Sequence, residues 1–207
     1  MEKERASQVA GRGPLELLPQ ARERVVLASQ SPRRAEILRA VGWPFEAEAG
    51  DVDETLRAGE QAARYVERLA RAKAEAVAAR RLFGLVVGAD TVVVVDGEVL
   101  GKPRDAAEAH RMLRRLRGRW HEVLTGVALL RAETKQCVNA HERTRVRFAP
   151  MTDAEIEWYV STGEPADKAG AYAVQGQGAL FIEAIEGDYW NVVGLPVCLV
   201  YKLSAEI

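Results

Sequence analysis

Two adjacent arginines, Arg33 and Arg34, are placed where they could bind a phosphate. They follow an apolar run at residues 25–28 that predicts a buried strand, and Ser31 and Pro32 are typical of a helix N-cap and first helical position. Cations in a first turn oppose the helix dipole by about 0.3 to 1 kcal/mol each, whereas a bound anion would benefit from both the dipole and the guanidinium groups. The pair therefore indicates an anion site, against the alternative of solvated arginines at an ordinary strand-to-helix junction.

Two further ionisable residues lie among apolar neighbours, where a charge needs a partner. Lys73 falls on the apolar face of a helix predicted from about residue 61 to 81, so its amine must either reach water at an edge or meet an anion. Asp90 lies in the β-branched run 85–95, which is too apolar for a half-exposed strand. A metal ion, a lysine or a ring of donors is expected beside Asp90, although backbone N–H groups alone satisfy many structural aspartates.

The remaining elements follow from periodicity and turn signals. Asp96-Gly97 predicts a hairpin after the apolar run, and residues 46–60 resemble an acidic turn. Residues 163–196 are rich in glycine and aromatic residues and carry no clear period. The other predictions are helices at 105–116, from 152 to 163 and at 196–207, with antiparallel strands at 120–130 and 137–148.

Composition limits the classes of protein to consider. The chain has 207 residues, 48% of them hydrophobic, which is enough for a real core. Its 29 Lys and Arg balance 30 Asp and Glu, so no overall field attracts nucleic acid or an anionic membrane. We therefore expect no nucleic-acid partner, and the basic run at residues 111–119 is interpreted as a solvated helix face.

Location and domain organisation also follow from simple counts. Cys137 and Cys198 lack paired spacing, which argues against a disulfide framework or a structural zinc site and favours a reducing cytoplasm. No apolar run approaches the roughly 18 residues of a membrane span, so no membrane partner is expected. Residues 1–21 are predicted to be a loose N-terminal tail and residues 22–207 a single domain.

Several common catalytic motifs are missing from the sequence. There is no phosphate-binding G-x-x-x-x-G-K-[ST] loop, and Gly176-Gln177-Gly178 lacks the third glycine of a dinucleotide fingerprint. Both His-Glu pairs lack the second histidine of a zinc hydrolase, so each histidine is interpreted as a surface or strand residue. The unusual charges instead form a set suited to phosphate and a hard divalent cation: the cations Arg33, Arg34, Lys73 and Lys102, with the carboxylates Glu54 and Asp90.

Six segments carry a resemblance to a known family. They are LASQSPRR (27–34), GADTVV (88–93), LGKP (100–103), HEVLTG (121–126), DKAGAY (167–172) and GDYWNVVGLP (187–196). In this order they resemble the Maf (septum formation inhibitor-like) nucleotide pyrophosphatases, and the resemblance runs from about residue 25 to 203. It implies an elongated α/β fold with a strongly twisted mixed sheet and flanking helices, similar to the inosine triphosphate pyrophosphatases, with the active-site cleft between two lobes.

The resemblance also implies an activity and roles for particular residues. The activity is hydrolysis of a nucleoside triphosphate between the α and β phosphates, giving the monophosphate and pyrophosphate. Asp90 matches the catalytic base, and Glu54 matches an acid that helps to hold Mg²⁺ or Mn²⁺. Arg33, Thr91 and Gln175 match positions linked to selectivity, whereas the remaining active-site cations of the family match Arg34, Lys73 and Lys102.

Chemistry leaves some of these roles open. The base and metal-ligand roles compete for the same oxygens of Asp90, so Asp90 is a candidate for both. Ser29 and Ser31 could add hydroxyl donors to a phosphate, although a plain N-cap explains Ser31 equally well.

The substrate prediction depends on the segment around Gln175. Residues 167–172 with Gln175-Gly176 resemble the subgroup acting on dTTP and UTP, not the one directed at a 7-methylated guanine nucleotide. A glutamine amide can match the donor-acceptor edge of uracil or thymine and reject a mismatched edge. Ala173, where the family more often has glycine, and Gln177, an unusual polar residue here, depart from the pattern and bear on the exact base, with modified pyrimidine triphosphates as further candidates.

Three alternatives remain at this point. A nonenzymatic regulator of septum formation would bind a nucleotide or protein in the cleft without turnover. A broad or purine-directed triphosphate pyrophosphatase would keep the chemistry and lose the pyrimidine preference. A nucleic-acid-binding module is the weakest of the three, given the balanced charge. A homodimer is the candidate assembly.

Overall fold

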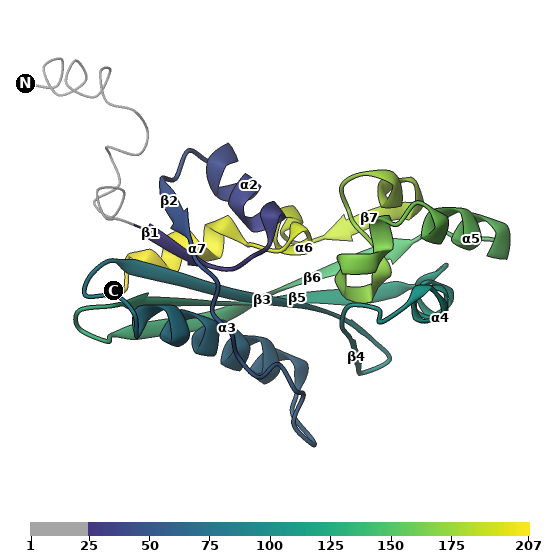
Figure 1. The fold of residues 1–207 in the computed structure, drawn as a ribbon. Coiled ribbons are helices and arrows are strands. Elements are labelled where there is room, and N and C mark those ends of the chain that lie inside the picture. The colour runs from purple at the N-terminus through teal and green to yellow at the C-terminus, as the bar shows by residue number, and fades with distance from the viewer. Residues whose placement is uncertain (1–24) are drawn as a thin grey trace, which may run out of the picture.

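One open, mixed sheet runs through the part of the chain that the computed structural model describes, residues 25–207 (Figure 1). Its seven strands lie in the order β2-β1-β3-β5-β6-β7, with β4 paired to β3. β1 is parallel to β2 and β3, and every other pair is antiparallel. The strands are β1 (Val25–Ala28), β2 (Phe45–Ala47), β3 (Leu85–Val95), β4 (Glu98–Leu100), β5 (Trp120–Arg131), β6 (Cys137–Phe148) and β7 (Ile182–Glu186).

Three long strands give the molecule its elongated shape, because β3, β5 and β6 run along most of its length (Figure 1). Helix α3 covers one face of the sheet, whereas α2, α6 and α7 gather at one end of the opposite face and α4 and α5 at the other end (Figure 1). The helices are α2 (Pro32–Ala40), α3 (Ala62–Ala78), α4 (Ala106–Leu116), α5 (Asp153–Ser161), α6 (Tyr189–Val193) and α7 (Val197–Ser204).

Strand β3 loses its neighbours along part of one edge. β1 pairs with β3 only as far as Gly88, and β4 begins to pair at Val93. The stretch between them, which holds Asp90 and Thr91, is paired only on its β5 side. Since successive side chains of a strand point to opposite faces, Asp90 faces the α3 side and Thr91 faces the α2 side. At this gap in the sheet, Asp90 and Thr91 therefore line one common space although their side chains point to opposite faces.

The sequence-based fold prediction is confirmed in class and in most elements. Helices and strands appear at each range predicted from periodicity, and Asp96-Gly97 forms the hairpin turn with positive φ at both residues. The acidic segment 46–60 is not wholly a turn, because the edge strand β2 includes its first residues. The glycine-rich region 163–196 contains elements that no hydrophobic periodicity predicted. They are β7, α6 and the short 3-10 helices η3 (Glu164–Asp167), η4 (Ala169–Ala171) and η5 (Gln177–Phe181).

The predicted tail at residues 1–21 lies outside the described residues. Among the described helices, none has the length and apolar character needed to cross a membrane.

Helix α3 lies unusually close to the sheet because glycines face it. A Cβ added at Gly88 would stand 2.1 Å from the carbonyl oxygen of Ala70, and one added at Gly126 would stand 2.2 Å from that of Val66. Real side-chain carbons do not approach backbone oxygens so closely, so these positions require glycine. The contact lets the helix backbone pack directly on β3 and β5, which sets the height of Lys73 above the strand.

The glycine contact gives a stability prediction. Gly88→Ala should lower the free energy of unfolding by at least about 2 kcal/mol, because the new methyl group forces α3 away from the sheet. Urea denaturation of the purified variants measures this. Gly101→Ala is the matched control, since a Cβ at Gly101 would meet no atom within 4 Å. Equal stability of the two variants would contradict the packing argument.

Candidate active site

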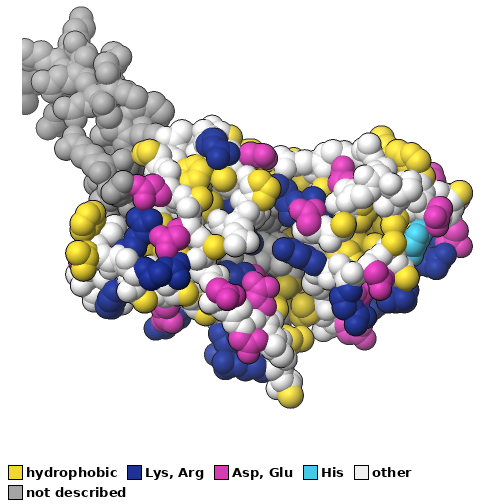
Figure 2. Space-filling view, in the orientation of Figure 1, with side chains coloured by type: hydrophobic (Ala, Val, Ile, Leu, Met, Phe, Trp, Pro, Cys, Tyr) yellow, Lys and Arg dark blue, Asp and Glu magenta, His cyan; other side chains and the backbone are white. Residues whose placement is uncertain are grey.

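A cavity of about 910 Å³ lies at the gap in the sheet and is lined by residues of α2, α3, α6, η3 and η4. Figure 2 shows charged side chains of both signs gathered around a hollow near the middle of the molecule. All nine residues predicted from the sequence line this one cavity: Ser29, Arg33, Arg34, Glu54, Lys73, Asp90, Thr91, Lys102 and Gln175. Because they come from loops, helices and strands far apart in the chain, the fold brings them together although their sequence spacing does not.

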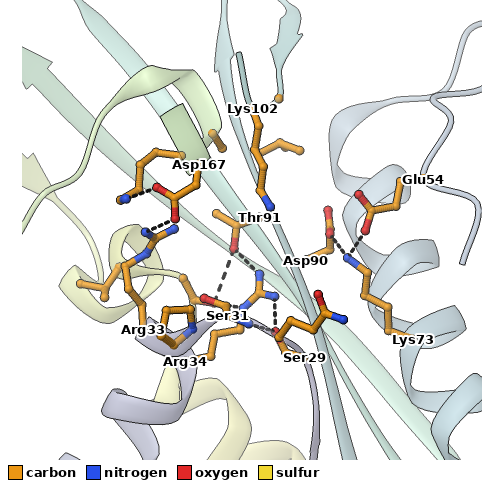
Figure 3. A pocket seen from close by; sticks show the side chains of 18 of the residues that line it. Ser29, Ser31, Arg33, Arg34, Glu54, Lys73, Asp90, Thr91, Lys102 and Asp167 are labelled. Atoms are coloured by element: carbon orange, nitrogen blue, oxygen red, sulfur yellow. Dashed lines mark hydrogen bonds and ion pairs between the residues drawn. The ribbon is translucent and has the colours of Figure 1, made fainter. Parts of the chain in front are cut away.

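Lys73 is the partner that the buried Asp90 needs. Its Nζ lies 2.6 Å from Asp90 Oδ1 and 2.6 Å from Glu54 Oε1 (Figure 3). The Lys73 and Asp90 side chains are each 12% exposed, whereas Glu54 is 60% exposed. Of the partners expected beside Asp90, the structure therefore shows a lysine. Of the two expectations for Lys73, it shows contact with an anion. The ammonium group holds two carboxylates at the α3 side of the cavity.

Arg34 ties together three elements at the other side of the cavity. Its Nε donates to the Gly194 carbonyl at 2.8 Å, and its two terminal nitrogens donate to Ser29 Oγ at 3.1 Å and Thr91 Oγ1 at 3.0 Å. Burial lowers the pKa of Arg34, against the opposing effect of the Asp90 charge. An arginine remains charged under these conditions, so Arg34 supplies a desolvated positive charge whose hydrogen bonds go to the protein itself.

The two serines that precede α2, Ser29 and Ser31, both line the cavity, and Ser29 also makes hydrogen bonds within the protein. Ser31 occupies the N-cap position of α2, but its side chain makes no capping hydrogen bond. Ser29 Oγ instead accepts a hydrogen bond from the Ser31 backbone N–H at 3.1 Å, in addition to the one from Arg34. Ser29 therefore fixes the strand-to-helix turn that presents both arginines.

Arg33 and Lys102 are the cations whose side chains are most available to a ligand. Arg33 is 25% exposed and lies 3.7 Å from Asp167, so it reaches from α2 across to η3. Lys102 follows β4, and its ammonium group points into the cavity (Figure 3). Gln175 lines the same cavity from the loop before η5 and is exposed. A polyanion in the cavity would therefore meet one cation from α2 and one from the loop after β4.

A buried hydrogen-bond network behind Thr91 was not predicted from the sequence. Thr91 Oγ1 lies 2.9 Å from Thr125 Oγ1, which donates to the Asn191 carbonyl at 3.1 Å. The Asn191 amide in turn donates to Val123 O and Thr144 Oγ1. The network fastens α6 to β5 and β6 and so holds the Gly194 carbonyl against Arg34. The sequence signal that could have revealed α6 is Asp188, a typical N-cap residue directly after Gly187.

His121 is a strand residue, as interpreted, but it is deeply buried. Its Nε2 lies 2.7 Å from Tyr172 Oη, and burial lowers its pKa from 6.5 to about 4. Tyr172 lines the cavity, and burial raises its pKa. The neutral imidazole therefore packs and orients Tyr172 and does not change charge near neutral pH.

The buried histidine predicts a pH dependence of stability. Since the folded pKa lies below the unfolded one, the unfolded state binds the proton first, and stability present above pH 6.5 is lost as the pH falls to about 4. His121→Gln should remove this contribution, which amounts to about 3 kcal/mol over that range. Urea denaturation at pH 7 and pH 4.5 compares the two proteins. If the free energy of unfolding fell equally in the wild type and in His121→Gln between pH 7 and pH 4.5, the lowered pKa of His121 would be contradicted.

The basic run on and after α4 is occupied by local ion pairs. Arg114 and Arg117 contact Asp153, and Arg115 and Arg119 contact Glu98 and Asp96 respectively. Local acids thus balance these arginines, in keeping with a solvated helix face.

The sheet, broken at one edge and surrounded there by cations and carboxylates, places the protein among the α/β proteins with a charged cleft. The chain matches the family described as Maf-like protein over residues 24–207. A dTTP/UTP pyrophosphatase of Symbiobacterium thermophilum is 57% identical over 84% of this chain and 89% of its own length. One of Geotalea uraniireducens is 52% identical over 86% of this chain and 92% of its own length.

A solved structure supports the fold independently. The Ham1 protein of Staphylococcus aureus superposes with a TM-score of 0.51 at 15% identity, covering 89% of this chain and all of that one. The chain belongs to the Maf family, which confirms the resemblance inferred from its motifs.

Proposed function

We propose that this protein is a nucleoside triphosphate pyrophosphatase that hydrolyses dTTP and UTP to the monophosphate and pyrophosphate. The observation that carries the proposal is the buried Lys73–Asp90 pair, set in a cavity lined by further cations. The names of relatives more than 50% identical over most of the chain support the reaction and the bases.

The chemistry follows from where charge develops. Attack of water on an anhydride phosphorus places negative charge on the bridging and nonbridging oxygens, which nearby cations stabilise. Arg33 and Lys102 would contact the triphosphate oxygens, whereas the buried charge of Arg34 acts through the field of the site. Asp90 would orient the attacking water and accept its proton. Lys73 holds the Asp90 carboxylate in place for this role.

A divalent cation, Mg²⁺ or Mn²⁺, is part of the proposal. Glu54 and Asp90 would hold it, and the geometry fits because both carboxylates converge on one ammonium group. Residues 25–207 contain no cluster of three or more His, Cys, Asp or Glu able to hold a metal, so substrate oxygens and water would complete the shell. When bound, the ion would neutralise charge on the phosphate oxygens.

Base selectivity is assigned to three residues. The Gln175 amide would pair with the donor-acceptor edge of uracil or thymine, whose mismatch in other bases leaves a polar group unpaired. Arg33 would act by its contact across the cleft with Asp167. Thr91 would act through Arg34, whose guanidinium group donates a hydrogen bond to the Thr91 hydroxyl. Modified pyrimidine triphosphates are further candidate substrates.

We also propose a cytoplasmic location, which the two free cysteines support, since Cys198 is exposed and unpaired. A homodimer stays a prediction.

Product analysis tests the proposed reaction. The purified protein, with Mg²⁺ or Mn²⁺, is incubated separately with dTTP, UTP, CTP, ATP, GTP and 7-methyl-GTP, and nucleotides and pyrophosphate are quantified. We expect monophosphate and pyrophosphate from dTTP and UTP, with at least about tenfold lower kcat/KM for the others. Diphosphate with orthophosphate would overturn the cleavage site, and absence of turnover would favour the nonenzymatic regulator.

A further inference from the structure

Glu164, a residue outside the predicted site, is surrounded by donors from the loop that carries Gln175. Its Oε1 accepts hydrogen bonds from Tyr159 Oη at 2.7 Å and from the Gly178 N–H at 2.9 Å. Its Oε2 accepts from the Gln177 N–H at 2.9 Å. A single half-buried carboxylate thus fixes the backbone directly after Gln175.

The chain before Gln175 is fixed by the same group of residues. Tyr159, which is fully buried, uses its hydroxyl to donate to Glu164 and to accept from the Ala173 N–H at 3.1 Å. Gly176 has φ +83°, and a Cβ there would lie 2.4 Å from Glu164 Oε2. The loop 173–178 is therefore wrapped tightly around the Glu164 and Tyr159 side chains.

The Gln175 side chain depends on this support. Its amide makes no hydrogen bond to another residue of the described chain, so the loop backbone alone sets the position from which the exposed side chain reaches into the cavity. Burial alone would raise the pKa of Glu164, but the hydrogen bonds from Tyr159, Gln177 and Gly178 outweigh this and lower it, which keeps the carboxylate ionised at neutral pH. Burial and then Glu164 raise the pKa of Tyr159, which keeps its hydroxyl protonated as a donor.

We infer that Glu164 is a positioning residue for base selectivity: it holds the loop 173–178 so that the Gln175 amide faces the base. The inference rests on the proposed function in that it takes the ligand to be a pyrimidine nucleotide. A hydrogen-bonding site discriminates between bases only while its donors and acceptors are held in place, because a loop that can shift brings its amide within reach of a mismatched edge as well. Glu164 touches neither the phosphate-binding cations nor Asp90.

The test compares binding of two analogues that differ only in the base. Isothermal titration calorimetry gives the Kd of α,β-imido-dTTP and α,β-imido-dCTP, which resist cleavage between the α and β phosphates. Glu164→Gln keeps the shape of the side chain but replaces one acceptor oxygen by a donor NH₂ group that faces a backbone N–H. We expect the ratio of the two affinities to fall about tenfold, mainly through weaker dTTP-analogue binding, as in Gln175→Ala.

Two further variants keep the result specific. Tyr159→Phe removes the hydroxyl between Glu164 and Ala173, so it should lower the ratio in the same direction even if Glu164→Gln fails to fold. Glu155→Gln is the matched control, because Glu155 also accepts from a backbone N–H, that of Thr152 at 2.6 Å, but at the start of α5 and away from the loop. It should leave the affinity ratio unchanged.

The outcomes separate this inference from the proposed function. A wild-type ratio in both Glu164→Gln and Tyr159→Phe would overturn the inference, as would an equal fall in Glu155→Gln or no base discrimination by the wild type. Failure of the wild type to release pyrophosphate from dTTP, with the binding ratio falling as expected in Glu164→Gln, would overturn only the proposed reaction and support the inference.

Discussion

The ion pair between Lys73 and Asp90 is the interaction on which the site depends. An aspartate within a strand as buried as β3 is stable as a charge only beside a partner, and removing one member of a buried pair costs about 3 to 5 kcal/mol. The pair in turn needs α3 at one height above the sheet, which Gly88 and Gly126 allow. The charge state of the candidate base Asp90 therefore depends on the backbone packing of α3 against these two glycines.

The interrupted edge of β3 explains how one short segment serves two parts of a site. Asp90 faces Lys73 and Glu54 on the α3 side, while Thr91 faces Arg34 on the α2 side. Glu54 and Asp90 thus lie at one wall of the cavity and the buried Arg34 at the other, where Arg33 also contacts Asp167 of η3. Lys102 enters the same cavity from the end of β4 (Figure 3). The space between the two walls suits a chain of phosphates.

The sequence predicted the charged part of this site well because charges in apolar surroundings are rare and need partners. Lys73 and Asp90 stood out for that reason, and strong periods predicted α3, β3, β5 and β6. The loop around Glu164 was missed, since its carboxylate binds backbone N–H groups, which leave no pattern in the side chains. β7 and α6 were missed for a related reason: both are short and depend on tertiary contacts, namely the pairing of β7 with β6 and the hydrogen bonds of Asn191 in α6.

The most direct test of the account is the effect of Asp90→Asn on turnover and on binding measured together. The substitution keeps the size of the side chain and removes the charge that would accept a proton from water. We expect kcat for dTTP to fall at least about 100-fold, while the affinity for α,β-imido-dTTP, measured without a divalent cation, stays within a few-fold of wild type. A kcat within about threefold of the wild-type value would contradict the central role given to the Lys73–Asp90 pair.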